Sequence, residues 1–507
     1  MKLTDQQQNF ISTVLGTTSH IALIARAGCG KTSTILVTVD AIVEHQPGAE
    51  IIVCAYNKAI KDEVAAKLVQ RGHTDWKKVS ASTIHGLGFG LVRYVFNNPQ
   101  VEDKKVLNLL DKQLSWSVQQ NTVISQFRQQ INQLVHCAKQ AGVGFFPDAP
   151  IADALVWHQL ADHFDIDGLE DADQMERVVA VAQEVYSRSL DQTDVIDYDD
   201  MVLFPLIKNL RVKFGKDYLF LDEAQDLSRT RQALAKKFLK PQGRMFVVGD
   251  DRQAIYGFSG ADADALDNLI TSLDAVICPL SITWRCPQAV VREAQRHVPD
   301  IVAADTAAEG TVAIIEELPG DLGIGDAILC RATAPLISTA YDLIRKGIAA
   351  KVEGRAIGDG LDKLALRWSV KNIDQLLVKL DEYKTRETQK FLALDNPQRA
   401  EQVADKCDTL AEICHSCLRA GRRTINDVRA AIAKLFGEDV KGCVVLATYH
   451  RSKGREWPRV ILLEHGKRCP SRYARQQWQL RQEDNLAYVA KTRAQKTLLY
   501  WEPVSTH

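Results

Sequence analysis

Residues 25–32 constrain this chain more than any other segment, because they lie between an apolar run and a run with helical spacing. Their sequence is Ala-Arg-Ala-Gly-Cys-Gly-Lys-Thr, preceded by the apolar residues 21–24 and followed by the helical pattern of 34–42. A strand, a glycine-rich turn and a helix in this order form a phosphate-binding loop. Lys31 then supplies an ammonium group to the phosphates, and Thr32 a hydroxyl ligand to Mg²⁺. The leading glycine of the usual spacing is Ala25, and a glycine-rich turn without a ligand is the alternative reading.

Two further apolar runs end in side chains that ATP hydrolysis needs. Residues 217–221 lead into Asp222 and Glu223, and residues 245–248 lead to a polar turn that contains Gln253. Adjacent carboxylates after a strand fit a Mg²⁺ ligand, Asp222, and a base that polarises the attacking water, Glu223. Gln253 is a candidate contact to the γ-phosphate. The three strand ends together predict one ATP-hydrolysing site.

Other strand ends carry side chains that suit nucleic acid. Residues 50–58 have the pattern of a buried strand with a polar end, and residues 80–86 bring hydroxyl groups and the imidazole of His85, which suit phosphate contacts. A purely structural histidine is the alternative for His85. Tyr256 and Phe258 follow the third strand, where flat side chains suit base stacking.

Composition indicates a multidomain globular protein. The chain has 507 residues, of which 46% are hydrophobic and 25% charged, so three or four domains are expected. No apolar run is long enough to cross a membrane and the N-terminus lacks the apolar segment of a signal peptide, so we expect a cytoplasmic protein without membrane partners. Residues 441–507 contain 13 Lys and Arg against 5 Asp and Glu, whereas the whole chain has a net charge of −1. This asymmetry favours a local basic channel for nucleic acid over a solvated face.

The eleven cysteines are scattered, which indicates reduced thiols rather than a disulfide framework. Cys407, Cys414 and Cys417 form the one cluster. Their spacing places them on one helical face, which favours core packing, with a metal site as the alternative.

Seven segments in order resemble the motifs of UvrD/Rep-type superfamily 1 DNA helicases. They are the adenine-reading segment 3–7 and segments similar to motifs I to VI at 28–32, 222–226, 249–258, 280–285, 448–457 and 485–494. The resemblance implies an ATP-hydrolysing enzyme of bacterial, plasmid or phage context that uses Mg²⁺. Its ATP-binding residues would be Gln7, Ala27, Gly28, Cys29, Gly30, Lys31, Thr32, Ser33, Trp284, Gly454 and Glu456.

The resemblance also assigns roles to single residues. Gln7 would bind adenine, Trp284 would stack on it where the family usually has tyrosine, and Glu456 would contact the ribose. Arg285 and Arg493 would act as arginine fingers that stabilise charge on the γ-phosphate. The DNA contacts would be Tyr56, Asn57, Thr83, His85, Tyr256, Phe258, Thr448 and His450. Residues 55–58 lack a phenylalanine common in UvrD itself and are nearer to F-box-helicase-like members.

The expected fold class is α/β, with two tandem RecA-like domains built on parallel sheets and a helical insertion in each. Strands expected at 327–330, 443–447, 460–463 and 498–501 form the second sheet. The domains would be a first core at 1–96 and 196–280 with a helical insertion at 97–195, and a second core at 281–357 and 441–507 with a small helical insertion at 358–440.

The resemblance implies ATP-driven movement along single-stranded DNA in the 3′ to 5′ direction, on single-stranded and partial duplex substrates. The insertion at 358–440 is much smaller than in UvrD-type enzymes, so we expect modest unwinding unless a protein partner assists. The alternative is an ATP-gated clamp or recruiting subunit of a nuclease or replication complex.

Overall fold

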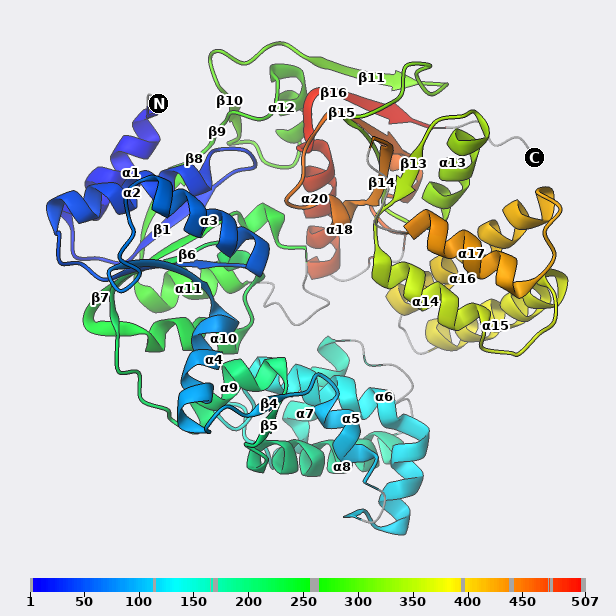
Figure 1. Ribbon diagram of the computed structural model, residues 1–507, viewed down its shortest axis with the longest axis horizontal. Coiled ribbons are helices and arrows are strands. Elements are labelled where there is room, and N and C mark those ends of the chain that lie inside the picture. The colour runs from blue at the N-terminus through cyan, green and yellow to red at the C-terminus, as the bar shows by residue number, and fades with distance from the viewer. Residues whose placement is uncertain are drawn as a thin grey trace. The chain divides into compact units, whose positions relative to one another are not determined.

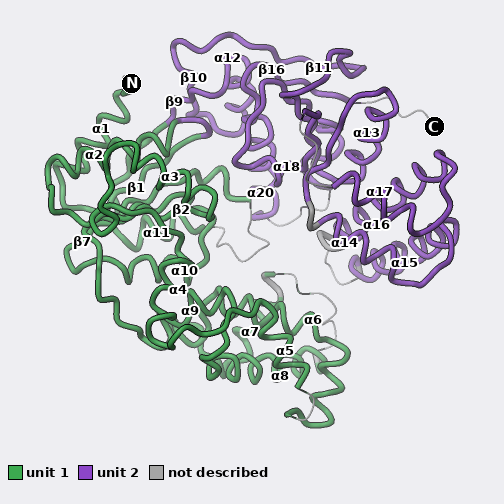
Figure 2. Tube along the Cα trace, viewed as in Figure 1, with its two compact units in different colours: residues 1–26, 30–280 green, residues 27–29, 281–507 purple. Residues whose placement is uncertain are grey.

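The computed structural model describes residues 3–112, 115–164, 166, 172–255, 264–393, 397–436, 442–472, 474 and 477–502. The chain divides into two compact units (Figure 2). Unit 1 contains residues 1–26 and 30–280, and unit 2 contains residues 27–29 and 281–507. None of the helices within the described ranges is long and apolar enough to cross a membrane.

Unit 1 is built on a six-stranded parallel sheet with the strand order β3-β2-β6-β7-β1-β8 (Figure 1). The central strands are apolar and buried on both faces, as parallel strands covered by helices require. The strands are β1 (Ile21–Ala25), β2 (Ile51–Ala55), β3 (Val79–Thr83), β6 (Lys216–Leu221), β7 (Leu239–Gly249) and β8 (Val276–Leu280). The surrounding helices are α1 (Asp5–Gly16), α2 (Lys31–His45), α3 (Lys58–Gln70), α4 (Ile84–Val95), α9 (Tyr198–Ile207), α10 (Arg229–Lys237) and α11 (Ala265–Leu273), with short 3₁₀ turns at Ala224–Asp226 and Asp251–Gln253.

A helical insertion separates α4 from α9. It comprises α5 (Lys105–Leu110), α6 (Val118–Ala141), α7 (Ala154–His163) and α8 (Ala172–Asp191), with the paired short strands β4 (Gln100–Val101) and β5 (Val195–Ile196) at its base. The insertion shares a hydrophobic core with α4 and α9, and this core contains Trp157 and Tyr186, which meet edge to face. The two strands at the base were not predicted from the sequence.

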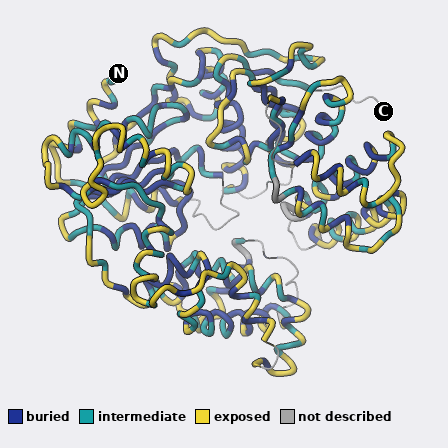
Figure 3. Tube along the Cα trace, viewed as in Figure 1, coloured by how far each residue is buried: buried dark blue, intermediate teal, exposed yellow. Residues whose placement is uncertain are grey.

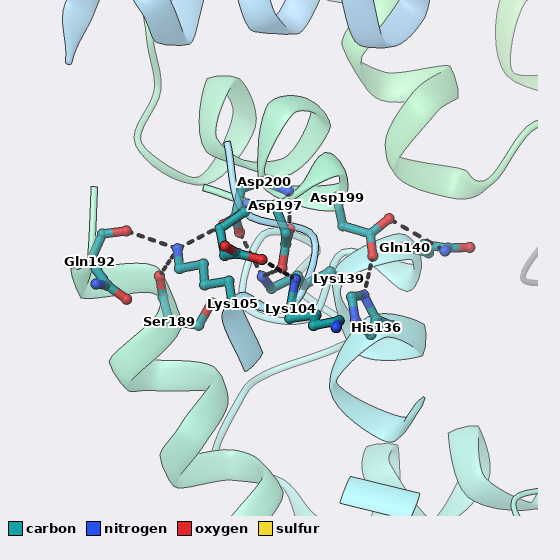
Figure 4. A network of polar contacts seen from close by, with 11 residues as sticks. Lys104, Lys105, His136, Lys139, Gln140, Ser189, Gln192, Asp197, Asp199 and Asp200 are labelled. Carbon is teal, nitrogen blue, oxygen red and sulfur yellow. Dashed lines mark hydrogen bonds and ion pairs between the residues drawn. The ribbon is translucent and has the colours of Figure 1, made fainter. Parts of the chain in front are cut away.

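Two buried lysines join the insertion to α9 (Figure 4). Lys139 on α6 lies 2.5 Å from Asp197 and 2.7 Å from Asp200, and Lys105 on α5 lies 2.7 Å from Asp200. Burial alone would lower the pKa of Lys139, but Asp200 and Asp197 outweigh it and raise that pKa to about 12. Asp197 is also the N-cap of α9, so the network fixes the start of that helix.

Unit 2 contains a second six-stranded parallel sheet with the order β11-β16-β15-β12-β14-β13. Its strands are β11 (Thr311–Ile315), β12 (Asp326–Cys330), β13 (Ala350–Val352), β14 (Val444–Thr448), β15 (Trp457–Leu463) and β16 (Ala494–Trp501). The four strands predicted from the sequence are β12, β14, β15 and β16. The two parallel sheets confirm the predicted fold class.

The remaining elements of unit 2 are helical except for a small parallel pair. That pair is β9 (Ile282–Thr283) and β10 (Val302–Ala303), and the helices are α12 (Gln288–Ala294), α13 (Ala334–Arg345), α14 (Arg355–Ala365), α15 (Ile373–Ala393), α16 (Pro397–Arg419), α17 (Ile425–Phe436), α18 (Tyr449–Ser452), α19 (His465–Arg468) and α20 (Gln477–Lys491).

Helices α14 to α17 share one hydrophobic core with the sheet of unit 2 (Figure 3). Cys407, Cys414 and Cys417 on α16 lie in this core, each at most 3% exposed. Among the described residues, no group of three or more His, Cys, Asp or Glu side chains is arranged to hold a metal ion. The three thiols therefore contribute apolar packing.

Candidate nucleotide site and nucleic-acid interface

The loop between β1 and α2 has the backbone conformation of a phosphate cradle. Gly28 and Gly30 have φ angles of 74° and 80°, in the left-handed region that glycine adopts without steric cost. Gly30 is the N-cap of α2, so Lys31, Thr32 and Ser33 form the first helical turn. The N-terminal N–H groups of a helix favour an anion, which is the property that a nucleotide phosphate uses.

Lys31 meets the carboxylate that the sequence assigned as the catalytic base. Its Nζ lies 2.6 Å from Glu223 Oε1, and both side chains are mostly buried. Glu223 follows Asp222 at the end of β6 and has a φ of 51°, an uncommon and costly conformation for a residue with a side chain. The Gln225 amide donates to the other Glu223 oxygen at 2.5 Å. The structure thus brings Lys31, Asp222 and Glu223 together.

A second cluster follows β7, the strand between β6 and β1. Asp250 is fully buried and lies 3.0 Å from the Arg26 guanidinium, while Gln253 donates to its other oxygen at 2.7 Å. Gln225 accepts from the backbone N–H of Asp250 at 3.1 Å, which connects the two clusters. Sequence reasoning gave no role to Arg26, Gln225 or Asp250. The signal available for them was their position at the carboxyl ends of three predicted strands.

Burial governs the ionisation of this site. Burial, with the neighbouring Glu223 charge, raises the pKa of Asp222 to about 6. Burial also raises the pKa of Asp250, although Arg26 opposes the change. For Lys31, burial alone would lower the pKa, but Glu223 and Asp222 outweigh it and raise it. The site therefore offers carboxylate oxygens, the ligand type that a divalent cation prefers, while Lys31 and Arg26 compensate part of their charge.

Gln7 lies beside the phosphate loop. It is 1% exposed, its amide donates to Thr34 Oγ1 on α2 at 2.9 Å, and its oxygen accepts from the N–H of Thr4 at 3.0 Å. Thr4 and Gln7 form a capping box that starts α1. The residue predicted to read adenine is therefore held against α2 by the cap of its own helix.

Unit 2 contains the other predicted nucleotide contacts. Trp284 is 52% exposed, and Arg285 forms an ion pair with Glu456, which also accepts from Gln495 at 2.8 Å. Arg493 is 1% exposed and donates to the carbonyl oxygens of Val489 and Arg455 at 2.8 and 3.2 Å. Gly454 has a φ of 79° in the turn before Glu456.

Three of the predicted DNA-binding residues are helix N-caps at the carboxyl ends of strands. The side chains of Asn57, Thr83 and Thr448 accept the N–H groups of Ile60, Gly86 and Arg451 and so begin α3, α4 and α18. Helix N-termini attract phosphate, so these positions suit a nucleic-acid backbone.

The neighbouring predicted DNA contacts are neutral or aromatic. Tyr56 is half-buried directly after β2. Burial lowers the pKa of His85 to about 4 and that of His450 to about 3, so both imidazoles are neutral at pH 7. Tyr256 and Phe258, the predicted stacking residues, lie outside the described residues.

Several cations of the basic tail, residues 441–507, have partners or are buried within unit 2. Arg455 pairs with Glu353 at 2.6 Å, Arg459 pairs with Asp321 and Asp326 at 2.9 and 2.7 Å, and Arg468 pairs with Glu464. Lys491 and Arg493 are buried. Part of the local positive charge is therefore compensated or buried within unit 2.

Three features together define a P-loop nucleotide-binding protein. They are the glycine-rich loop between β1 and α2, the predicted catalytic base Glu223 after β6, and the two parallel sheets. Family comparisons give the class: residues 3–274 match the UvrD/REP helicase N-terminal domain, and residues 173–501 match the UvrD-like helicase C-terminal domain. This chain belongs to the UvrD/Rep helicase family, which confirms the resemblance.

Individual relatives are distant. The chain is 25% identical over 279 residues to the ATP-dependent DNA helicase Rep of Buchnera aphidicola subsp. Schizaphis graminum, a match that covers 52% of this chain and 38% of the relative. It is 26% identical over 301 residues to a probable DNA helicase II homolog of Mycoplasma capricolum, covering 57% and 40%. It is 24% identical over 312 residues to F-box DNA helicase protein 1 of Schizosaccharomyces pombe, covering 58% and 32%. The chain spans about two fifths or less of each relative.

Proposed function

We propose that this chain is an ATP-dependent DNA helicase and single-stranded DNA translocase that moves 3′ to 5′. The observation that carries the proposal is the meeting of Lys31, Asp222 and Glu223 at the carboxyl edge of the sheet of unit 1. It is supported by membership of a helicase family and by relatives named as DNA helicases.

The chain's own residues suit phosphoryl chemistry. Lys31 and the first turn of α2 would bind the phosphates, and Glu223 would accept a proton from the attacking water. Thr32 and Asp222 would hold Mg²⁺, and the raised pKa of buried Asp222 fits a site that gains from a bound cation. Bound Mg²⁺ would neutralise charge on the phosphates. Gln253, fixed on Asp250, would orient toward the γ-phosphate.

The proposal also assigns roles to residues of unit 2. Arg285 and Arg493 would stabilise charge in the transition state, and Trp284 and Glu456 would bind the base and ribose. Hydrolysis would then be coupled to stepping on DNA, through contacts at the N-caps Asn57, Thr83 and Thr448. Single-stranded and partial duplex DNA are the proposed substrates, with a nuclease or a replication or repair factor as a protein partner.

The insertion of unit 2 favours modest unwinding. Helices α14 to α17 end at Phe436 and pack into the core of unit 2. Separating each base-pair step costs roughly 1.4 kcal/mol, so efficient unwinding requires a structural element that binds the duplex. We therefore expect robust translocation and weak strand separation by the isolated chain.

The test uses partial duplexes with a 3′ or a 5′ single-stranded tail and streptavidin displacement from either end of a biotinylated oligonucleotide. The Glu223→Gln variant serves as the inactive control. Preference for the 3′-tailed duplex and displacement of streptavidin from the 5′ end support the proposal. Preference for the 5′-tailed duplex and displacement from the 3′ end overturn the direction. DNA-stimulated ATP hydrolysis without movement would instead identify an ATP-gated clamp or recruiting subunit.

A further inference from the structure

One exposed surface of unit 1 combines aromatic rings and lysines away from the predicted site. We define the aromatic-lysine surface as Trp76, Lys77, Tyr94, Lys213, Phe214 and Lys216. Trp76, Tyr94 and Phe214 are 72, 70 and 76% exposed, which is unusual for three large rings on one surface. None of the seven helicase-like segments contains these residues.

Contacts between its residues make the surface continuous. Lys216 Nζ donates to the carbonyl oxygen of Lys77 at 3.2 Å, which joins the segment before β3 to the start of β6. Lys213 donates to the Tyr94 hydroxyl at 2.5 Å, and its Nζ lies 4.3 Å from the centroid of the Tyr94 ring. This contact joins the segment just before β6 to the end of α4. Lys77 lies over the Trp76 ring at 5.9 Å. The exposed rings and the ammonium groups therefore lie on neighbouring segments of one surface.

The surface lies at the amino edge of the sheet, opposite the candidate site. Trp76 and Lys77 precede Val79, where β3 begins, and Lys216 begins β6. The N-cap Thr83 and the carboxylates Asp222 and Glu223 are at the other ends of these strands. Strands of five or six residues span about 15–20 Å. The surface is thus separate from the predicted DNA contacts.

Its charge is strongly positive in a chain whose net charge is −1. Residues 71–78 and 208–216 together contain seven Lys and Arg and one Asp. Considering only residues within the described ranges, no carboxylate forms an ion pair with Lys77, Lys213 or Lys216. Cations that are not already neutralised by protein carboxylates are those that bind phosphates and release counterions.

We propose that the aromatic-lysine surface binds single-stranded nucleic acid as a second site, with bases stacked on Trp76, Phe214 and Tyr94 and phosphates on the lysines. Stacking platforms beside a basic track are the general device for binding single strands without sequence preference. An acidic protein segment would use the charges but would not require three exposed rings. The proposal does not depend on the proposed motor function, because the site lies outside the segments that would hydrolyse ATP.

The experiment measures binding of a fluorescent oligothymidine, long enough to reach both sites, over a range of salt concentrations without nucleotide. The Lys77→Ala/Lys213→Ala/Lys216→Ala variant should reduce the slope of log K against log salt by about 2, because each single-strand phosphate contact contributes about 0.7. The Trp76→Ala/Phe214→Ala variant should weaken binding at least about tenfold at fixed salt. Sequence should have little effect on either value.

Controls separate this site from charge loss and from misfolding. The Lys346→Ala/Lys371→Ala/Lys434→Ala variant removes the same charge from exposed positions in unit 2 and should leave the slope unchanged. Lys77→Arg/Lys213→Arg/Lys216→Arg should retain the original slope. Unchanged slope and affinity in both test variants, with binding of an acidic peptide or of no ligand, would overturn the proposal. ATP hydrolysis stimulated by a short oligonucleotide should be the same in all variants, so a failed motor and a failed second site give different results.

Discussion

The buried network of Figure 4 makes a strong prediction about stability, because it places two lysines and two aspartates out of contact with water. Asp200 is fully buried, and its carboxylate contacts both Lys105 and Lys139 at 2.7 Å. It also accepts the backbone N–H of Asp197 at 3.0 Å, which completes the capping box of α9. Asp200→Asn keeps the shape of the side chain and removes its charge.

The expected loss in the free energy of unfolding follows from the contacts that the two lysines keep in the Asp200→Asn variant. Lys139 would keep the carboxylate of Asp197, but Lys105 would keep only the carbonyl oxygens of Ser189 and Gln192. Breaking a buried ion pair from one side costs about 3–5 kcal/mol. Since a domain is stabilised by about 5–15 kcal/mol, Asp200→Asn should remove a large part of the stability of unit 1. Urea denaturation would measure it, with the buried Trp157 of the insertion contributing to the fluorescence signal.

Asp199→Asn is the matched control. The Asp199 carboxylate contacts His136 at 2.6 Å, but both groups are partly exposed, with 13 and 28% of their side chains accessible. An accessible pair contributes at most about 1 kcal/mol. If Asp200→Asn costs less than about 1 kcal/mol, or if Asp199→Asn costs as much as Asp200→Asn, the reasoning from burial is wrong.

Three further predictions concern the candidate site and its surroundings. Lys31→Ala should lose nucleotide binding, whereas Glu223→Gln should keep nucleotide binding and lose turnover. Titration with a fluorescent nucleotide measures binding, and a phosphate-release assay measures turnover. Equal nucleotide affinities in the two variants would contradict the assignment. Arg285→Ala and Arg493→Lys should each lower kcat by roughly 10³-fold with a smaller effect on nucleotide affinity, and because Arg493 is buried its variant must first show a normal unfolding temperature. Burial lowers the pKa values of His85, His450 and His465 to about 4, 3 and 4, so below pH 6.5 the unfolded chain binds protons that the folded chain does not. The contribution of these histidines to stability should therefore be complete above pH 6.5 and fall as the pH drops toward 4, by up to about 1.4 kcal/mol per pH unit for each histidine. In thermal unfolding, His85→Asn and His465→Asn should each make this fall less steep. An equally steep fall in both variants would refute the prediction.

Local patterns predicted the centre of the site because its residues are close to strand ends. The phosphate loop is a strand, a turn and a helix within 25 residues, and Asp222 and Glu223 directly follow an apolar run. Parallel strands place their carboxyl ends on one edge, so a correct strand assignment brings these segments together. Asn57 and Thr83, which the resemblance nominated as DNA contacts, also lie just after predicted strands, but their roles as N-caps are visible only in the structure.

The parts that the sequence did not reveal depend on pairings across long separations. Arg26 and Asp250 are 224 residues apart, and their ion pair follows from the adjacency of β1 and β7. The edge strand β11 is only partly buried and β13 has three residues, so neither shows the long apolar pattern of a central strand. The pairing of the basic tail within unit 2 also depends on tertiary partners such as Asp326 and Glu353.

On the proposed function, the ion pair of Lys31 with Glu223 would connect nucleotide binding to catalysis. Three carboxylates, Asp222, Glu223 and Asp250, are gathered in a largely buried region, and Lys31 and Arg26 compensate their charge. A nucleotide phosphate that binds Lys31 competes with Glu223 for the same ammonium group. On the proposed function, binding would therefore release the Glu223 carboxylate, still hydrogen-bonded to Gln225, to act on water. Glutamine at position 223 competes less strongly for Lys31, which explains why Glu223→Gln should bind nucleotide at least as tightly as the unaltered chain while it loses turnover.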